Sequence, residues 1–270
     1  VVAEKPLALT TKALAKLKAA SAKYPGKLFV RHNRRYEPAF NHIIEIMRSG
    51  ILGDVFEIKL CRHNFQFRDD WQTLVDCGGG QLNNWGPHII DHALCLLESP
   101  VDSMWSDLKN VAALGDAEDH LKVVFRGKNR RVVDLEISGG ISIGSPVYAV
   151  YGTRGTLICE DEQDIKLKYL DPKQKLPKRG TSSPATPAIN GGFGGSIQAK
   201  WIRKTIMVEP ANGANCGKIY HDVFMAIRHQ APYPVTFEQA SEVVRWTEQV
   251  KRQNQAFKLK PDVFGKKTLA

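Results

Sequence analysis

Apolar positions divide the chain into a short first segment and a much longer second one. Residues 1–2 form the end of an apolar strand, and after a loop a helical pattern begins near residue 10. Pro25-Gly26 ends that helix, and a short apolar run follows at residues 28–30. Strand, helix and strand in this order form the repeating unit of a parallel α/β sheet. We therefore expect residues 1–32 to be the last part of a doubly wound domain, whose other strands lie upstream of Val1.

From residue 33 onward, apolar residues recur first at the spacing of helices and then mostly at the spacing of strands. Apolar residues recur at helical spacing up to Gly50, a strand candidate covers residues 55–61, and a further helix covers about 87–98. Short strand-like runs then follow one another at residues 104–111, 120–125, 131–137, 146–151, 156–159, 165–169 and 201–208. A long segment without periodicity, residues 172–199, interrupts them, and two helices near 218–228 and 238–254 close the chain. The pattern predicts an α+β fold with a largely antiparallel sheet and flanking helices.

Composition limits the class of protein. With 270 residues and 43% apolar content, the chain can bury a large core, and no apolar run reaches the roughly 18 residues that would cross a bilayer. The five cysteines are scattered without a C-x-x-C pair, which argues against a disulfide framework or structural zinc and favours a reducing, cytoplasmic location. The net charge of +10 is spread among acidic residues, so we expect neither nucleic acid nor a membrane as partner, although an anionic ligand fits the charge.

The segment from Gly78 to His92 carries the strongest chemical signal. Three consecutive glycines allow a close backbone approach, and Gly86-Pro87 then starts a helix, because proline is tolerated at the first helical position. His88 therefore lies in the first turn, where the positive end of the helix disfavours a charged imidazole. A neutral histidine there could accept a proton as a general base, or could simply be hydrogen-bonded at the helix start.

Several segments together resemble one family, the Gfo/Idh/MocA oxidoreductases. Glu4-Lys5-Pro6 resembles the E-K-P motif of that family, and the segment from Asn33 to Pro38 resembles its N-R-R-F/Y-x-P segment. The glycine and histidine segment and the turn from Gly50 to Val55 match in the same order. The resemblance implies that residues 1–32 are a remnant of a dinucleotide-binding Rossmann domain. It implies that residues 33–270 form an open-faced α/β domain for substrate binding and oligomerisation.

The same resemblance implies roles for individual residues. Lys5 and His88 match the catalytic pair, which implies hydride transfer between the carbinol carbon of a sugar, polyol or glycoside and a nicotinamide, NAD or NADP. The resemblance implies that the cofactor is bound by Glu4, Lys5, Pro6 and Arg35. It implies that the substrate is bound by Asn33, Asn64, Asn84 and Asp91. Asn33 and Arg35 could instead hold their loop together, and Asp91 could orient His88 or be a buried helix acid. The resemblance also implies that the chain forms a homo-oligomer, a dimer or a tetramer.

Two features depart from the family pattern. Many members carry aspartate four residues before the histidine, where this chain has Asn84, and an amide cannot share the proton of the histidine. No G-x-G-x-x-G follows a strand, so the segment that would hold a cofactor pyrophosphate is missing from these residues. We expect the sequence to be a fragment that binds NAD(P) poorly by itself.

Two alternatives of other classes remain open. His88 and His92 share a helix face, and with Asp91 between them they are similar in spacing to metallohydrolase ligands, although a third ligand is unassigned. The second alternative is a catalytically silent binding or assembly module that uses the exposed face of the sheet.

Overall fold

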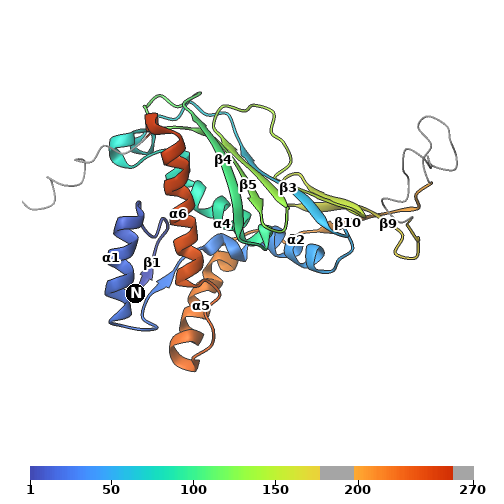
Figure 1. Cartoon of the computed structure of the whole chain (residues 1–270), viewed down its shortest axis with the longest axis horizontal. Coiled ribbons are helices and arrows are strands. Elements are labelled where there is room, and N and C mark those ends of the chain that lie inside the picture. The colour runs from blue at the N-terminus through green and yellow to red at the C-terminus, as the bar shows by residue number, and fades with distance from the viewer. Residues whose placement is uncertain (177–197, 258–270) are drawn as a thin grey trace, which may run out of the picture.

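The computed structural model describes residues 1–176 and 198–257 (Figure 1). It has a small parallel unit at the N-terminus and a large eight-stranded sheet with helices against it. The α+β class and the mainly antiparallel sheet expected from the sequence are confirmed. Within the described ranges, no helix is both long enough and apolar enough to span a bilayer.

The N-terminal unit is a strand, a helix and a strand. β1 (Val2–Ala3) pairs in parallel with β2 (Phe29–Val30), and α1 (Thr11–Ala22) connects them. Thr10 caps α1, because its hydroxyl accepts a hydrogen bond from the Ala13 amide. A short helical turn, η1 (Asn33–Tyr36), then leads into α2 (Pro38–Arg48).

The large sheet consists of a central strand, β3, with one antiparallel meander on each side of it. Its order is β10-β9-β8-β7-β3-β6-β5-β4, and all neighbours are antiparallel except β3 and β6. The strands are β3 (Val55–His63), β4 (Val101–Lys109), β5 (His120–Gly127), β6 (Val132–Ser138), β7 (Tyr148–Gly152), β8 (Gly155–Cys159), β9 (Asp164–Leu170) and β10 (Trp201–Met207). The chain enters through β3, builds β4 to β6 on one side, and then returns to pair β7 with the other edge of β3. Every strand predicted from the sequence is present, with ends shifted by a few residues.

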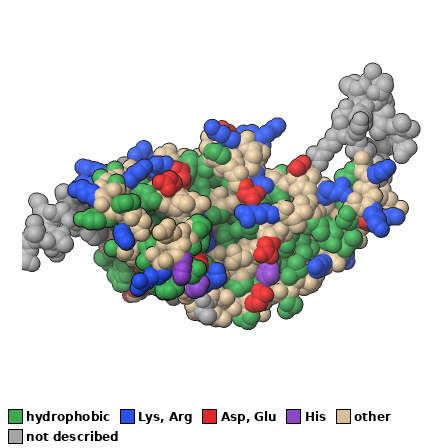
Figure 2. Space-filling model, turned by 90° about the horizontal axis from the view of Figure 1, so that it is seen from below, with side chains coloured by type: hydrophobic (Ala, Val, Ile, Leu, Met, Phe, Trp, Pro, Cys, Tyr) green, Lys and Arg blue, Asp and Glu red, His purple; other side chains and the backbone are tan. Residues whose placement is uncertain are grey.

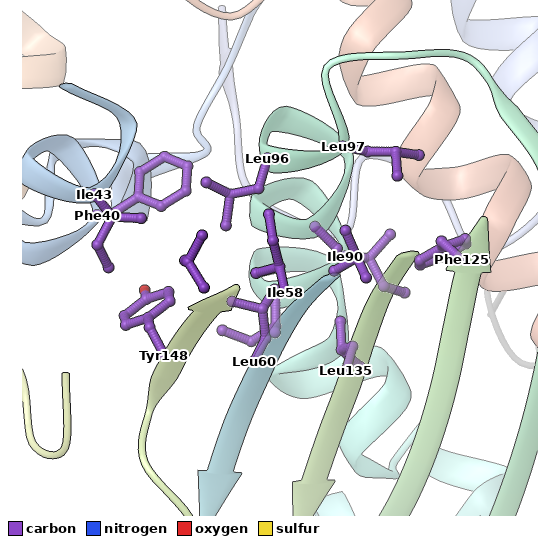
Figure 3. Packing of buried hydrophobic residues seen from close by; sticks show 14 of the residues in the cluster. Phe40, Ile43, Ile58, Leu60, Ile90, Leu96, Leu97, Phe125, Leu135 and Tyr148 are labelled. Atoms are coloured by element: carbon purple, nitrogen blue, oxygen red, sulfur yellow. The ribbon is translucent and has the colours of Figure 1, made fainter. Parts of the chain in front are cut away.

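Helices cover one face of this sheet. α4 (Gly86–Leu97) lies against β3, β5 and β6, and α6 (Phe237–Gln253) packs on α4 and β4, while α5 (Gly213–His229) extends away from the sheet beside η1. Figure 3 shows side chains of α4, such as Ile90, directed toward Ile58 and Leu60 of β3. Burial of these apolar groups stabilises the fold and fixes α4, and therefore His88, relative to the central strand.

Several short elements were not predicted from the sequence. They are the helical turns η1, η2 (Trp71–Thr73), η3 (Val75–Cys77) and η4 (Gln255–Phe257), and the single-turn helix α3 (Gln81–Asn84). These turns are too short to show a 3.6-residue period. Most of the long segment predicted at residues 172–199 lies outside the described ranges.

Candidate functional site

Lys5 and Asn84 bring the two best-matched motifs together. The Lys5 ammonium donates a hydrogen bond to the main-chain carbonyl oxygen of Asn84, 2.6 Å away. That carbonyl is open because Pro87 has no N–H to donate and the His88 amide bonds to the carbonyl of Trp85 instead. Partial burial lowers the pKa of Lys5, and the nearby Arg34 charge adds to this effect.

His88 lies in the first turn of α4, as the sequence predicts. It is 8% exposed, and its Nδ1 atom is buried without a hydrogen-bond partner, which leaves Nε2 as the nitrogen that could meet a ligand. Burial lowers the pKa of His88 to about 2, and the positive charges of Lys5 and Arg34 contribute. The imidazole is therefore neutral around pH 7 and free to accept a hydrogen bond.

Arg34 contributes positive charge to the same region. Its guanidinium lies over the Trp85 ring, 4.1 Å from the ring centroid, and forms an ion pair with the buried Glu37. Trp85 in turn meets the His88 ring edge to face at 6.2 Å. Two cations, Lys5 and Arg34, thus act on one neutral imidazole, an arrangement that would stabilise negative charge developing on a bound ligand.

The triple glycine shapes the floor of the site. Gly78 and Gly80 have φ of +72° and +97°, conformations that glycine adopts most readily. A Cβ on Gly80 would lie 2.2 Å from the carboxylate of Glu118, which accepts a hydrogen bond from the Leu82 amide and so caps α3. The glycines therefore let the chain turn tightly over Glu118.

A cleft of about 360 Å³ lies beside Lys5. It is lined by residues from three segments: Lys5, Pro6 and Leu9; Trp71 and Gln72; and Cys77, the three glycines, Asn83 and Asn84. The Asn84 side chain donates to Gln72 Oε1 at 3.2 Å, so this amide belongs to the cleft wall. The volume is in the range of small-ligand sites, and amide, ammonium and apolar groups converge on it.

Two residues expected to bind ligands instead bind each other. Arg35 donates to both carboxylate oxygens of Asp91, from Nη2 at 2.6 Å and Nε at 2.7 Å. Arg35 Nη1 also donates to the Pro234 carbonyl and to Gln239 Oε1, which ties η1 to α6. Asp91 is 2% exposed. The polar groups of Arg35 and Asp91 are occupied in a buried ion pair, so the geometry gives no support to the cofactor role expected of Arg35 or to the substrate role expected of Asp91.

The remaining predicted site residues do not all line the cleft beside Lys5. Asn64 is exposed and lines a small polar cavity of about 20 Å³ with Gln81 and Glu118, next to the Lys5 cleft. Asn33 has a buried side-chain oxygen without a partner. Glu4 points outward and pairs with Arg31 at 2.8 Å, and Pro6 lines the Lys5 cleft.

The metal-site alternative loses its ligands in this geometry. Asp91 is held by Arg35, and His92 is fully buried, stacked on Phe40 at 3.7 Å and 3.3 Å from the Tyr148 hydroxyl. Among the residues that the structure describes, no group of three or more His, Cys, Asp or Glu side chains could hold a metal ion.

Some residues around the site carry no signal in the sequence. Glu118 follows no motif, and burial raises its pKa to about 7. Lys251 of α6 is 7% exposed and donates to Asn83 Oδ1 at 2.7 Å. His32 is 2% exposed and its ring Nδ1 lies 3.9 Å from Asp91 Oδ2. Only the position of His32 directly before the N-R-R segment could have drawn attention to it.

Basic side chains elsewhere on the surface are dispersed. Figure 2 shows lysine and arginine interspersed with acidic and hydrophobic side chains over the face that it draws. On that face, the positive charge of the chain is not gathered into one stripe.

Comparison with known proteins bears on the family and on the fold. Residues 40–158 match the family model described as the GFO/IDH/MocA C-terminal domain. An uncharacterized oxidoreductase of Escherichia coli, YdgJ, is 30% identical over 187 residues, which cover 68% of this chain and 51% of that protein. The chain thus spans about half the length of that relative. The scyllo-inositol 2-dehydrogenase (NADP⁺) IolW of Bacillus subtilis is 25% identical over 251 residues, covering 91% of this chain and 67% of that protein.

A solved structure shares the fold. The NAD-binding protein from Listeria innocua superposes with a TM-score of 0.74 at 22% identity, over 94% of this chain and 72% of that one. At this identity the likeness establishes the fold alone.

Proposed function

Since the chain belongs to the Gfo/Idh/MocA family of oxidoreductases, we propose that it serves NAD(P)-dependent oxidation of a hydroxyl group on a sugar, polyol or glycoside. The observation that carries this proposal is the hydrogen bond between Lys5 and the Asn84 carbonyl, which holds an ammonium near the neutral imidazole of His88. The name of IolW, an inositol dehydrogenase, supports a polyhydroxylated substrate.

In the proposed reaction, the two side chains have complementary roles. The Lys5 ammonium donates a hydrogen bond to the substrate oxygen and stabilises its developing negative charge. His88, whose imidazole is neutral at pH 7, accepts the hydroxyl proton at Nε2 in this reaction. Asn84, through its amide, can orient a second hydroxyl but cannot take up a proton.

The residues near Lys5 fit the nicotinamide end of a cofactor. The cleft places the apolar surfaces of Pro6, Leu9 and Trp71 next to the amide groups of Gln72 and Asn84, which suits a flat ring that carries a carboxamide. A nicotinamide bound there supplies the hydride acceptor. Arg35 takes no part in this assignment, because Asp91 occupies it.

The test is turnover by the complete gene product. It would be incubated with NAD⁺ or NADP⁺ and a panel containing myo- and scyllo-inositol, glucose and a simple glycoside, while nicotinamide reduction is followed by absorbance. We expect reduction with at least one polyol or sugar, and its loss in His88→Gln, with the exposed His229→Gln as the control. Turnover that survives His88→Gln, or no reduction with any compound, would overturn the proposal.

A further inference from the structure

The C-terminal end of α6 is hydrogen-bonded to three separate parts of the chain. These are α1, the segment that follows the three glycines, and β4. Figure 1 shows α6 between the N-terminal unit and the large sheet. The Leu108 amide of β4 donates to Asn254 Oδ1 at 3.0 Å, and the Ser106 hydroxyl donates to Gln253 Oε1 at 2.6 Å. This end of the helix is therefore fixed to the large sheet.

Glu248 connects α6 to the segment that follows Lys5. Its Oε2 accepts a hydrogen bond from the amide of Thr11, the first residue of α1, at 2.8 Å. An α-helix leaves this amide without an internal partner, and a carboxylate there also suits the positive end of the helix. Lys5, Pro6 and Leu9 line the cleft just before Thr11. Glu248 therefore holds this wall of the cleft at a fixed place relative to α6.

Lys251 connects α6 to another wall of the same cleft. Its Nζ donates to Asn83 Oδ1 at 2.7 Å, and Lys251 is only 7% exposed. Asn83 Nδ2 in turn donates to the carbonyl oxygens of Gly78 and Gly79, at 2.9 and 3.0 Å. Because these carbonyls can only accept, the amide has one orientation, with its oxygen directed to Lys251. One side-chain amide thus links α6 to the glycine segment.

The glycine segment depends on hydrogen bonds for its position. Glycine has the largest conformational freedom in the unfolded chain and no side chain to pack. The Gly79 and Gly80 amides donate to the carbonyls of Leu74 and Gln72, at 2.9 and 2.8 Å. Asn83 supplies the donor on the other side of the segment. Loss of that donor would therefore loosen the wall that the glycines form.

We propose that Glu248 and Lys251 are positioning residues, which set the spacing between two walls of the cleft for the nicotinamide end of the cofactor. The two residues are three positions apart, about one helical turn. Neither belongs to the described residues that line the cleft, so they act through Thr11 and Asn83. The inference rests on the proposed function, which places the nicotinamide in this cleft.

The first readout is amide hydrogen exchange in the complete gene product without cofactor, measured by NMR. We expect the Gly79 and Gly80 amides to exchange about tenfold faster in Lys251→Met and in Asn83→Asp, with the amides of β3 unchanged. Asn83→Asp still accepts from Lys251 but cannot donate to the glycine carbonyls. Arg245→Met, at an exposed position of α6, is the control.

Two outcomes of this measurement would overturn the inference. One is native exchange at both glycines in Lys251→Met and Asn83→Asp. The other is equal acceleration in β3, which would show that these side chains stabilise the whole fold and do not position the glycine segment. If Asn83→Asp does not fold, Lys251→Met decides.

The second readout is the affinity for reduced nicotinamide cofactor, measured by the fluorescence of NADH and NADPH. We expect Kd to rise about tenfold in Lys251→Met and in Glu248→Leu, while kcat at saturating cofactor stays within about threefold. Glu248→Gln keeps an acceptor for the Thr11 amide and is expected to bind as the native protein does. Native affinity in both Lys251→Met and Glu248→Leu would overturn the inference.

The two readouts separate this inference from the proposed function. A native protein that binds neither NADH nor NADPH would overturn the proposed function. Hydrogen exchange needs no cofactor, so it would still show whether Lys251 holds the glycine segment through Asn83. Slow exchange that is lost in Lys251→Met, together with unchanged cofactor affinity, would show a structural tie alone and overturn the positioning role.

Discussion

The Lys5 ammonium and the carbonyl oxygen of Asn84 are 2.6 Å apart, although 79 positions separate the two residues in the sequence. The bond exists because Pro87 interrupts the helical hydrogen-bond ladder and leaves this carbonyl open. It fixes the loop after β1 to the junction of α3 and α4. A lysine that would otherwise be mobile on a loop is thus held at the end of the helix that carries His88.

Replacing Lys5 with methionine tests whether this ammonium stabilises the substrate oxygen. Methionine keeps much of the side-chain length and removes the charge. We expect kcat/KM to fall about 10²- to 10³-fold, the usual effect of losing one donor to a developing oxyanion. Steady-state kinetics of the complete gene product would measure the change, with Lys12→Met at an exposed position of α1 as the control. An equal effect in both variants would contradict a specific role for Lys5.

Gly80 and Gly78 form a matched pair for stability. Both have positive φ, but a Cβ on Gly80 would meet the Glu118 carboxylate at 2.2 Å, whereas a Cβ on Gly78 meets nothing within 4 Å. We expect Gly78→Ala to cost about 1–2 kcal/mol from backbone strain alone. Gly80→Ala should cost clearly more, because the carboxylate that caps α3 must also move. Denaturant unfolding would measure both, and equal losses would show that Glu118 moves freely.

The sequence predicts regular elements well because their apolar periods are long. The strands of the large sheet and helices α2, α4, α5 and α6 repeat their pattern often enough to be recognised. The same reasoning places His88 in a first helical turn, because Gly86-Pro87 is a local signal. It does not reveal that β3 pairs in parallel with β6, since pairing depends on contacts between distant segments.

The site is predicted less completely than the fold. Lys5, Asn84 and His88 lie in motifs, but the ion pair that occupies Arg35 and Asp91 joins residues 56 positions apart, and neither residue type signals its partner. A motif match shows which residues are candidates for the site, but it does not show whether their polar groups are available to bind a ligand. Charge and burial must be known before a polar residue can be assigned to a ligand.

Asp91→Asn tests whether the Arg35 ion pair is structural. The amide leaves the buried guanidinium without its counter-charge, and breaking a buried pair in this way typically costs about 3–5 kcal/mol. The control is Glu160→Gln, which removes the exposed pair with Lys166 and should cost about 1 kcal/mol or less. Chemical denaturation would measure both. Similar small losses would indicate that Asp91 is available for another role.

Buried neutral histidines make the stability of the protein depend on pH. Burial lowers the pKa of His92 to about 3 and that of His88 to about 2, whereas both would titrate near 6.5 in the unfolded chain. Below pH 6.5 the unfolded chain therefore binds more protons, so the free energy of unfolding falls as the pH falls toward 3. Glu118, with its pKa raised to about 7, acts in the opposite sense, because its folded form holds a proton between about pH 4.5 and 7.

His92→Phe separates these contributions. Phenylalanine can keep the stacking on Phe40 but cannot take up a proton. We expect the slope of unfolding free energy against pH, between about pH 4 and 6, to fall by about 1.4 kcal/mol per pH unit, the value for one proton. Denaturant unfolding across this range would measure the slope, with the exposed His229→Gln as the control. An unchanged slope in His92→Phe would mean that His92 is charged in the folded protein, in conflict with its full burial.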